Sequence, residues 1–418
     1  MNKFFRILKT QTVKDGFVVG LGTFFTAFFG FLFTILIARS LSPEKFGVFS
    51  ALASLVAILY SLGDLGVGPA IISFLPRHKD SEIKIISTSF WFQYIVGIII
   101  ALTLWSLAYF ADRIIPGSLP AHFYLVGSLC FNYILIGWAQ SVLTAKREFL
   151  RISMSQIIDS AFKIGFVYFL YRYSGLNISL ALAANAISVC IALFLIFSKE
   201  LLVVPLRFDK SIFTDLFHFS KWIAISRFFS VFYSKVDILL LNLLSGSFQA
   251  GIFAASSRVT MLFAIIVSSL GSVINPRFAR FKTKTDFLAY TKKVFLLISC
   301  VAFVLLLTVL FANKIILVVF GNMFFESIIV FQLLSLSMIP FLYSAIFTAA
   351  ILYTFQLPSF YAFLTFLNFF ITIAINLIFI PQIGYFAPVL GTLIANLVCI
   401  VISFWKVRTL YSNSQMLK

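Results

Sequence analysis

Long apolar stretches recur along the whole chain and limit what it can fold into. A helix needs about 20 apolar residues to cross the hydrocarbon core of a bilayer. About twelve such stretches follow one another, separated by short polar segments or by Pro and Gly. They cover residues 17–38, 46–63, 86–111, 122–143, 154–172, 178–197, 216–244, 250–274, 293–312, 328–350, 358–380 and 386–405. The sequence therefore predicts an all-α polytopic membrane protein with about 12 transmembrane helices, the first of them retained rather than cleaved as a signal peptide.

Composition and motifs exclude several other classes. Hydrophobic residues make up 61% of the chain and charged residues 11%, which excludes a water-soluble domain. The four Cys lie inside apolar stretches and the three His are far apart, so neither a disulfide framework nor a metal site is expected. No segment matches the phosphate-binding loop G-x-x-x-x-G-K-S/T, and no predicted loop exceeds about 20 residues. We therefore expect no ATPase domain and no cofactor.

Basic residues are distributed unevenly over the predicted loops. If the amino terminus is cytoplasmic, 23 of the 32 Lys and Arg residues fall in cytoplasmic segments and 5 on the opposite side. Such a bias over short loops predicts that both termini lie in the cytoplasm. The net charge of +18 then reflects membrane topology, and a nucleic-acid partner is not expected.

The two halves of the chain share a local pattern. The turns after the first and the seventh predicted span match at an offset of 204 residues, Gly47 with Gly251 and Phe49 with Phe253. Such a duplication predicts two pseudo-symmetric six-helix lobes with a cavity where they meet. The predicted lobes are residues 1–209, with spans 1–6, and residues 210–418, with spans 7–12. The alternative is that Gly and Phe recur because helical hairpins often carry them.

The segment after the first span resembles a known family. Residues 38–49, ARSLSPEKFGVF, are similar to the A-R-x-L-x-P-E-x-F/Y-G-x-F/Y signature of the bacterial polysaccharide repeat-unit flippases. Residues 63–68, GDLGVG, resemble that family's D-L-G-x-G close of the second span, and residues 236–258 resemble its D-x-x-x-L region followed by G-x-F/Y and Arg. Ser247 and Phe248 stand where the second repeat is expected to carry Pro-Glu, so the shape of that turn departs from the pattern.

The resemblance implies a function as well as a fold. Members of this family export O-antigen or capsule repeat units linked to a polyprenyl diphosphate, by alternating access between two lobes. The implied location is the bacterial cytoplasmic (inner) membrane, and the implied partners are the lipid-linked oligosaccharide, membrane lipids and the polysaccharide polymerase or chain-length machinery. The superfamily also contains multidrug exporters and the peptidoglycan-precursor flippase. No catalytic residue is expected, and H⁺ and Na⁺ both stay open as coupling ions.

Cations inside the spans are the predicted substrate-binding residues. Charge is costly in hydrocarbon, so Arg227 and Lys235 of the seventh span and Arg258 of the eighth are functional candidates. Charge-assisted bonds from such groups can replace the water around a diphosphate. Helical rise places Lys235 and Arg258 near mid-membrane. Asp237 shares a broad face with Arg227 and Lys235. The structural alternative to substrate binding is that Asp237 forms an ion pair with Lys235 or Arg258.

Other polar residues inside spans have two interpretations each, as cavity or gating groups or as structural ones. Asp159 and Lys163 are four residues apart, so an intrahelical ion pair is favoured over cavity lining. Asp64 precedes Gly66, Gly68 and Pro69, where a helix break capped by its carboxylate is favoured over a gating role.

A polar stripe on the eleventh span repeats every four residues and comprises Asn368, Thr372 and Asn376. It can hydrogen-bond sugar hydroxyls or neighbouring helices, and helix packing is favoured.

Two other functions compete with the flippase. A cation-coupled multidrug exporter of the same superfamily needs a cavity carboxylate, but residues 17–38 contain no acid. Cations inside the spans also outnumber acids, by one charge, which favours an anionic substrate. A polymerase or ligase of envelope synthesis usually has a large external loop, whereas the predicted external loops have about ten residues or fewer. The expected function is therefore that of a flippase and not of an enzyme.

Overall fold

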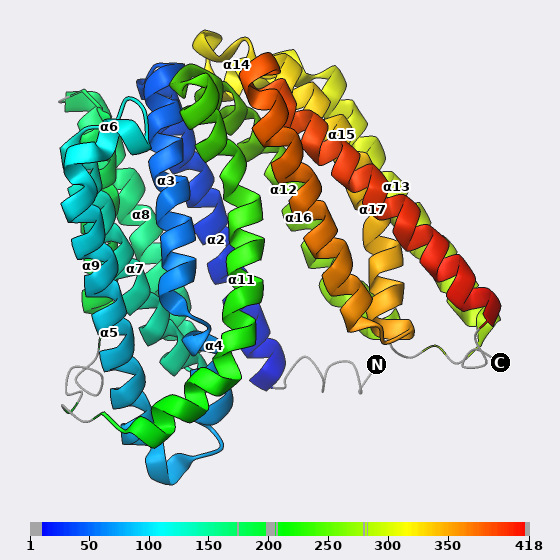
Figure 1. The fold of residues 1–418 in the computed structure, drawn as a ribbon, viewed down its shortest axis with the longest axis horizontal. Coiled ribbons are helices and arrows are strands. Elements are labelled where there is room, and N and C mark those ends of the chain that lie inside the picture. Colours follow the sequence, from blue (N-terminus) through cyan, green and yellow to red (C-terminus); the bar gives the residue numbers. More distant parts are fainter. Residues whose placement is uncertain are drawn as a thin grey trace. The chain divides into compact units, whose positions relative to one another are not determined.

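The structure is a computed structural model that describes residues 11–173, 175–197, 205, 208–278, 281 and 283–413. This part of the chain consists of helices and turns without strands (Figure 1). The long helices are α2 (Gln11–Ser40), α3 (Pro43–Asp64), α5 (Glu82–Ser106), α7 (Pro120–Ala145), α8 (Phe149–Tyr173), α9 (Ile178–Ile196), α11 (Lys210–Ser245), α12 (Ser247–Phe278), α13 (Lys284–Leu310), α15 (Ser327–Ala349), α16 (Pro358–Ile383) and α17 (Phe386–Asn413). The short ones are α4 (Val67–Phe74), η1 (Lys79–Ser81), η2 (Leu107–Phe110), α6 (Ala111–Ile114), α14 (Ala312–Phe320), η3 (Asn322–Phe324) and η4, a π-helix (Ala350–Thr354).

Eleven helices of the described residues are long and apolar enough to cross a membrane, and they coincide with eleven predicted spans. The chain is therefore a multi-pass membrane protein, as predicted. The exception is α8, the helix at the predicted span 154–172, which has 25 residues but falls outside the eleven. Its charged residues, among them Asp159 and Lys163, lower its hydropathy. At 1.5 Å per residue it is still about 37 Å long, and it packs along α2 and α9.

Local sequence signals set the helix starts. The Ser42 hydroxyl accepts the N–H of Lys45 at the start of α3, where Pro43 takes the first helical position. Asn177 caps α9 through the N–H of Leu180 at 2.8 Å. Thr283 caps α13 through the N–H of Asp286 at 3.2 Å. These caps fix where the apolar segments begin, because each satisfies a backbone donor that has no partner inside its helix.

The chain forms two compact units, Met1–Leu239 and Leu240–Lys418, which we call the N-terminal and the C-terminal unit. In the N-terminal unit α7 packs against α3, α4, α5, α8 and α9, and Trp138 of α7 is fully buried among them. In the C-terminal unit α15 packs against α12, α13 and α17. The boundary between the units lies inside α11, near its end. The two predicted lobes, which divide at residues 209 and 210, stay a prediction.

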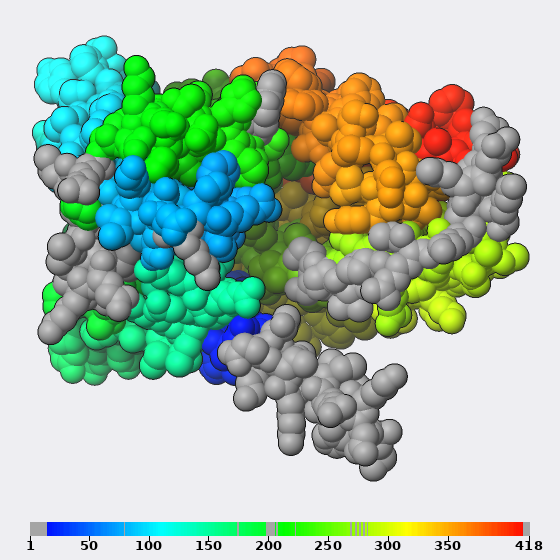
Figure 2. All heavy atoms as spheres, turned by 90° about the horizontal axis from the view of Figure 1, so that it is seen from below, coloured from blue at the N-terminus to red at the C-terminus, as the bar shows by residue number. Residues whose placement is uncertain are grey.

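The start of α11 is tied to α5 at one end of the N-terminal unit. The Asp209 carboxylate accepts the N–H groups of Ser211 and Ile212, and it pairs with Lys84 of α5 at 3.6 Å. Figure 2 shows this face, with the region around α4 and the start of α5 in blue beside the start of α11 in green. The backbone N–H of Ile212 is the main cause that lowers the pKa of Asp209. Desolvation, the second-largest effect, opposes it, and Ser211 and Lys84 lower the pKa further.

This lowered pKa predicts a pH-dependent contribution to stability. The ionised form of Asp209 is favoured in the folded protein, so it stabilises the fold above the ordinary pKa of an Asp carboxyl. The contribution is lost as the pH falls through the lowered pKa. Asp209→Asn should therefore lower the Tm at about pH 7 and lower it progressively less as the pH falls below the ordinary pKa of an Asp carboxyl. Scanning fluorimetry of the detergent-purified protein measures this, and a Tm difference that is equal at every pH would contradict it.

Candidate functional site: charged residues inside the helical bundle

A break in the second predicted span positions Asp64. Helix α3 ends at Asp64, Leu65 and Gly66 adopt positive φ angles of 44° and 70°, and α4 begins at Val67. The Asp64 Oδ1 atom accepts the N–H of Gly68 at 3.3 Å, inside the first turn of α4. Leu65 therefore has a left-handed backbone conformation, which is usual for glycine and unusual for leucine. The capping contact and the turn hold Leu65 in this conformation. The predicted break and the capping contact are both present.

The same carboxylate joins α3 to α5 and α11. Arg227 of α11 donates from Nη1 to Asp64 Oδ2 at 2.5 Å. Gln93 of α5 donates from Nε2 to the main-chain oxygen of Asp64 at 3.3 Å and to Oδ1 at 3.4 Å. The Asp64 side chain is 7% exposed and that of Arg227 is 44% exposed. Arg227 is therefore an accessible cation with a buried partner.

A second polar cluster lies between α7, α8 and α9 of the N-terminal unit. Lys163 donates to Asp159 Oδ2 at 3.2 Å and lies 3.5 Å from the hydroxyl of Tyr133. Ser188 donates to the other Asp159 oxygen at 2.8 Å, and Tyr133 donates to Asn185 at 3.0 Å. The side chains of Lys163 and Asp159 are only 13% and 15% exposed. The predicted intrahelical ion pair is present. Tyr133 of α7 and Ser188 of α9 make hydrogen bonds with its two members.

Lys235 and Asp237 lie beyond Arg227 on the same unbroken helix, α11. Both are half-buried and belong to the N-terminal unit. Eight residues separate Lys235 from Arg227, which is just over two helical turns, so the two cations lie at different depths along α11. The role of Lys235 in binding substrate stays a prediction, and so does that of Asp237 as a cavity or gating group.

Arg258 lies in the C-terminal unit, in the middle of the candidate span Ser247–Val267 of α12. It is half-buried, beside the exposed apolar side chains of Met261, Leu262 and Ile265. None of the hydrogen bonds and ion pairs between described residues involves its guanidinium group. A buried charge inside a membrane is normally paired, so this guanidinium can accept an anionic ligand.

The polar stripe of the eleventh span faces another helix. Thr372 and Asn376 of α16 are 1% and 0% exposed. A Cβ atom placed on Gly391 of α17 would lie 3.5 Å from both the Asn376 Oδ1 atom and the main-chain oxygen of Thr372. Asn368, two turns earlier than Asn376, is half-buried. These contacts favour helix packing for Thr372 and Asn376.

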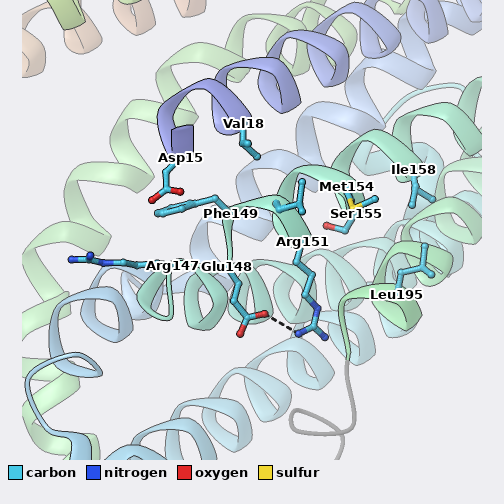
Figure 3. Close-up of a pocket in the computed structure, with 11 residues that line it drawn as sticks. Asp15, Val18, Arg147, Glu148, Phe149, Arg151, Met154, Ser155, Ile158 and Leu195 are labelled. Atoms are coloured by element: carbon cyan, nitrogen blue, oxygen red, sulfur yellow. Dashed lines mark hydrogen bonds and ion pairs between the residues drawn. The ribbon is translucent and has the colours of Figure 1, made fainter. Parts of the chain in front are cut away.

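A groove with a volume of about 700 Å³ lies at the start of α8, and none of the predicted site residues lines it (Figure 3). Apolar side chains such as Val18, Met154 and Leu195 line most of it. Of its charged residues, Arg151 pairs with Glu148 at 3.0 Å. The lining residues carry both signs of charge and no Cys or His, and no group of metal-binding side chains occurs among the described residues.

Residues 12–282 of the chain match the family model described as polysaccharide biosynthesis protein. The chain belongs to this family. A curated relative described as "Putative O-antigen transporter", from Shigella flexneri, is 23% identical over 327 residues, which cover 74% of this chain and 76% of the relative. The match confirms the suspected family.

Solved structures of transporters share the fold of this chain. The lipid II flippase MurJ in an inward closed conformation has a TM-score of 0.76 and 13% identity, with 94% of this chain and 87% of that chain covered. An inward-facing multidrug resistance MATE family transporter of the MOP superfamily has a TM-score of 0.72 and 16% identity, with 93% and 96% covered. At these identities the likeness concerns the fold alone.

Sequence reasoning on this family member missed the residues that complete both clusters. Gln93, Tyr133, Asn185 and Ser188 were not predicted as site residues, although each is a polar side chain inside an apolar stretch. The pairing of Asp64 with Arg227 was also missed, because 163 residues separate them. A search for single polar residues in apolar spans would have found Gln93 and Asn185, but not their partners.

Proposed function

We propose that this protein is a flippase that exports lipid-linked oligosaccharide repeat units, with the diphosphate bound by Arg258. The single observation that carries the proposal is the half-buried Arg258 guanidinium in the middle of a membrane span, which makes no hydrogen bond or ion pair with a described residue. A diphosphate that crosses hydrocarbon must exchange its water for fixed positive groups, and arginine binds phosphate with two parallel hydrogen bonds. Family membership and the curated relative support a polysaccharide precursor as the substrate.

The other parts of the proposal follow from the predicted topology and the fold. The protein would lie in the cytoplasmic membrane with both termini in the cytoplasm, and would alternate between inward-open and outward-open states. Arg227 and Lys235 would assist Arg258 along the path of the head group, while the lipid tail stays in the bilayer. The polysaccharide polymerase would act on the exported unit.

A gene deletion in the native host tests the proposed function. The downstream polymerase is kept intact, and lipid-linked oligosaccharides of the membrane fraction are analysed by mass spectrometry. We expect a complete, unpolymerised repeat unit to accumulate on the polyprenyl carrier, and the wild-type gene to restore the normal level. Unchanged lipid-linked sugars, together with altered sensitivity to cationic drugs, would overturn the proposal and favour a multidrug exporter.

A further inference from the structure

We propose that the Asp64–Arg227 ion pair is a first binding site for the anionic head group, which binds by replacing the Asp64 carboxylate on Arg227. The inference rests on the proposed function. It gives the ion pair the role of first binding site, which Arg258 does not have. The ligand class is a diphosphate ester. Asp64 would act as a competing anion that limits how tightly the head group is held.

The exposure of Arg227 is the first argument. Its side chain is 44% exposed, whereas the Asp64 side chain is 7% exposed. A guanidinium group carries five N–H donors in one plane, and the contact with Asp64 Oδ2 is made by Nη1. Arg227 also lies one turn inside the candidate span Ile223–Ser245, close to the end at Ile223. A head group at that end of the span can therefore reach it.

The second argument is that Asp64 is held in place without Arg227. Its Oδ1 atom accepts hydrogen bonds from the N–H of Gly68 at 3.3 Å and from Gln93 at 3.4 Å. The carboxylate would therefore keep two partners after Arg227 turns to a phosphate. It then remains a fixed negative charge beside the bound anion, and like charges at short distance oppose binding. A transported ligand needs such weakened binding in order to leave the site.

The third argument is that the break beside Asp64 is packed against α11. A Cβ atom on Gly66 would lie 2.6 Å from the main-chain oxygen of Ser220 and 3.0 Å from the main-chain nitrogen of Ala224. Both belong to the two turns of α11 before Arg227. Breaking the ion pair therefore removes one of the interactions that hold the α3–α4 break against α11. Because α11 continues past Leu239, the same helix enters the C-terminal unit.

A second intramembrane ion pair of the N-terminal unit, Asp159–Lys163, is arranged differently. Lys163 and Asp159 are 13% and 15% exposed, and neighbouring hydroxyl groups contact both of them. A ligand cannot reach either partner without breaking that network. The contrast with the exposed Arg227 distinguishes a pair that can exchange partners from a pair that serves packing.

Binding of farnesyl diphosphate to the full-length protein in lipid nanodiscs tests the proposal, with farnesol as the uncharged control. Asp64→Asn keeps the hydrogen-bond acceptor and removes the charge, so we expect about tenfold tighter binding, because a like charge next to the diphosphate is lost. Arg227→Gln should weaken binding about tenfold. In the double variant the gain from Asp64→Asn should disappear, because the two residues act on one contact. Glu82→Gln is the matched control, since Glu82 pairs with Lys146 at 2.7 Å in the same unit, and it should leave binding unchanged.

The outcomes separate this inference from the proposed function. Binding that Asp64→Asn leaves unchanged or weakens would overturn the role of the ion pair. An equal gain from Asp64→Asn in the absence of Arg227 would do the same. Either result leaves the proposed function standing, provided that Arg258→Gln weakens binding. If the wild type binds farnesyl diphosphate no better than farnesol, the proposed function fails as well. Thermal unfolding of each variant is followed in parallel. Asp64→Ser, which also keeps an acceptor for Gly68, replaces Asp64→Asn if that variant does not fold.

Discussion

Replacing Arg258 with glutamine should lower the export of lipid-linked repeat units about a hundredfold. Loss of one charged partner from a buried contact costs about 2–5 kcal/mol, and about 2.8 kcal/mol corresponds to a factor of a hundred. Glutamine is shorter than arginine but keeps the first three carbons of its side chain and a polar end, so most of the packing of α12 is retained. The amount of unpolymerised repeat unit in a deletion strain that expresses the variant measures the effect, with protein level determined by immunoblot.

Two further variants sharpen this experiment. Arg258→Lys keeps the charge but binds phosphate through a single point, so it should retain more export than the glutamine variant. Arg172→Gln removes an exposed cation at the end of α8 and should leave export unchanged. Full export by a stably expressed Arg258→Gln protein would show that the guanidinium is not needed, and would leave the diphosphate without its proposed binding group.

Replacing Lys163 with methionine should destabilise the protein by about 3–5 kcal/mol, because it leaves the Asp159 carboxylate buried without its cation. Ser188 would remain as the one hydrogen-bond donor to that carboxylate among its described contacts. The double variant Asp159→Asn/Lys163→Met should recover most of the loss, since a neutral amide needs no counter-charge. The Tm of the purified variants in detergent measures both effects.

Export by the double variant then decides between the two interpretations of this cluster. Near wild-type export by a protein of normal stability would assign Asp159 and Lys163 a structural role. A stable double variant that fails to export would place the pair in the transport path. Equal stability of the single and the double variant would contradict the argument from a buried, uncompensated charge.

Hydropathy predicted most of this fold because a membrane span is encoded locally. Eleven predicted spans needed only length and apolar composition. The break at Asp64 was also predictable, since Gly66, Gly68 and Pro69 follow it within one short segment. The helix α8 shows the limit of this reasoning. Its Asp159 and Lys163 reduce its hydropathy, and only the surrounding helices reveal how these charges are accommodated.

The candidate site was predictable as a set of residue types but not as a set of contacts. Spacing within one helix predicted the Asp159–Lys163 pair, because residues four apart lie on one face. It could not predict that Arg227 pairs with Asp64, since tertiary packing brings α3 and α11 together. It also did not show that Arg258 lies without a partner among the described residues, or that Thr372 and Asn376 are buried against α17.

The polar character of α8 has a consequence for how the chain enters the membrane. Asp159 and Lys163 lie close to the middle of this helix, and an isolated charge there costs about 2.5–3.5 kcal/mol during insertion by the translocon. Their partners Tyr133 and Ser188 belong to α7 and α9, which are made before and after α8. We therefore expect α8 to be integrated as part of an α7–α8–α9 assembly rather than alone. Biogenesis of this transporter would then depend on the nascent chain reaching α9 before α8 leaves the translocon.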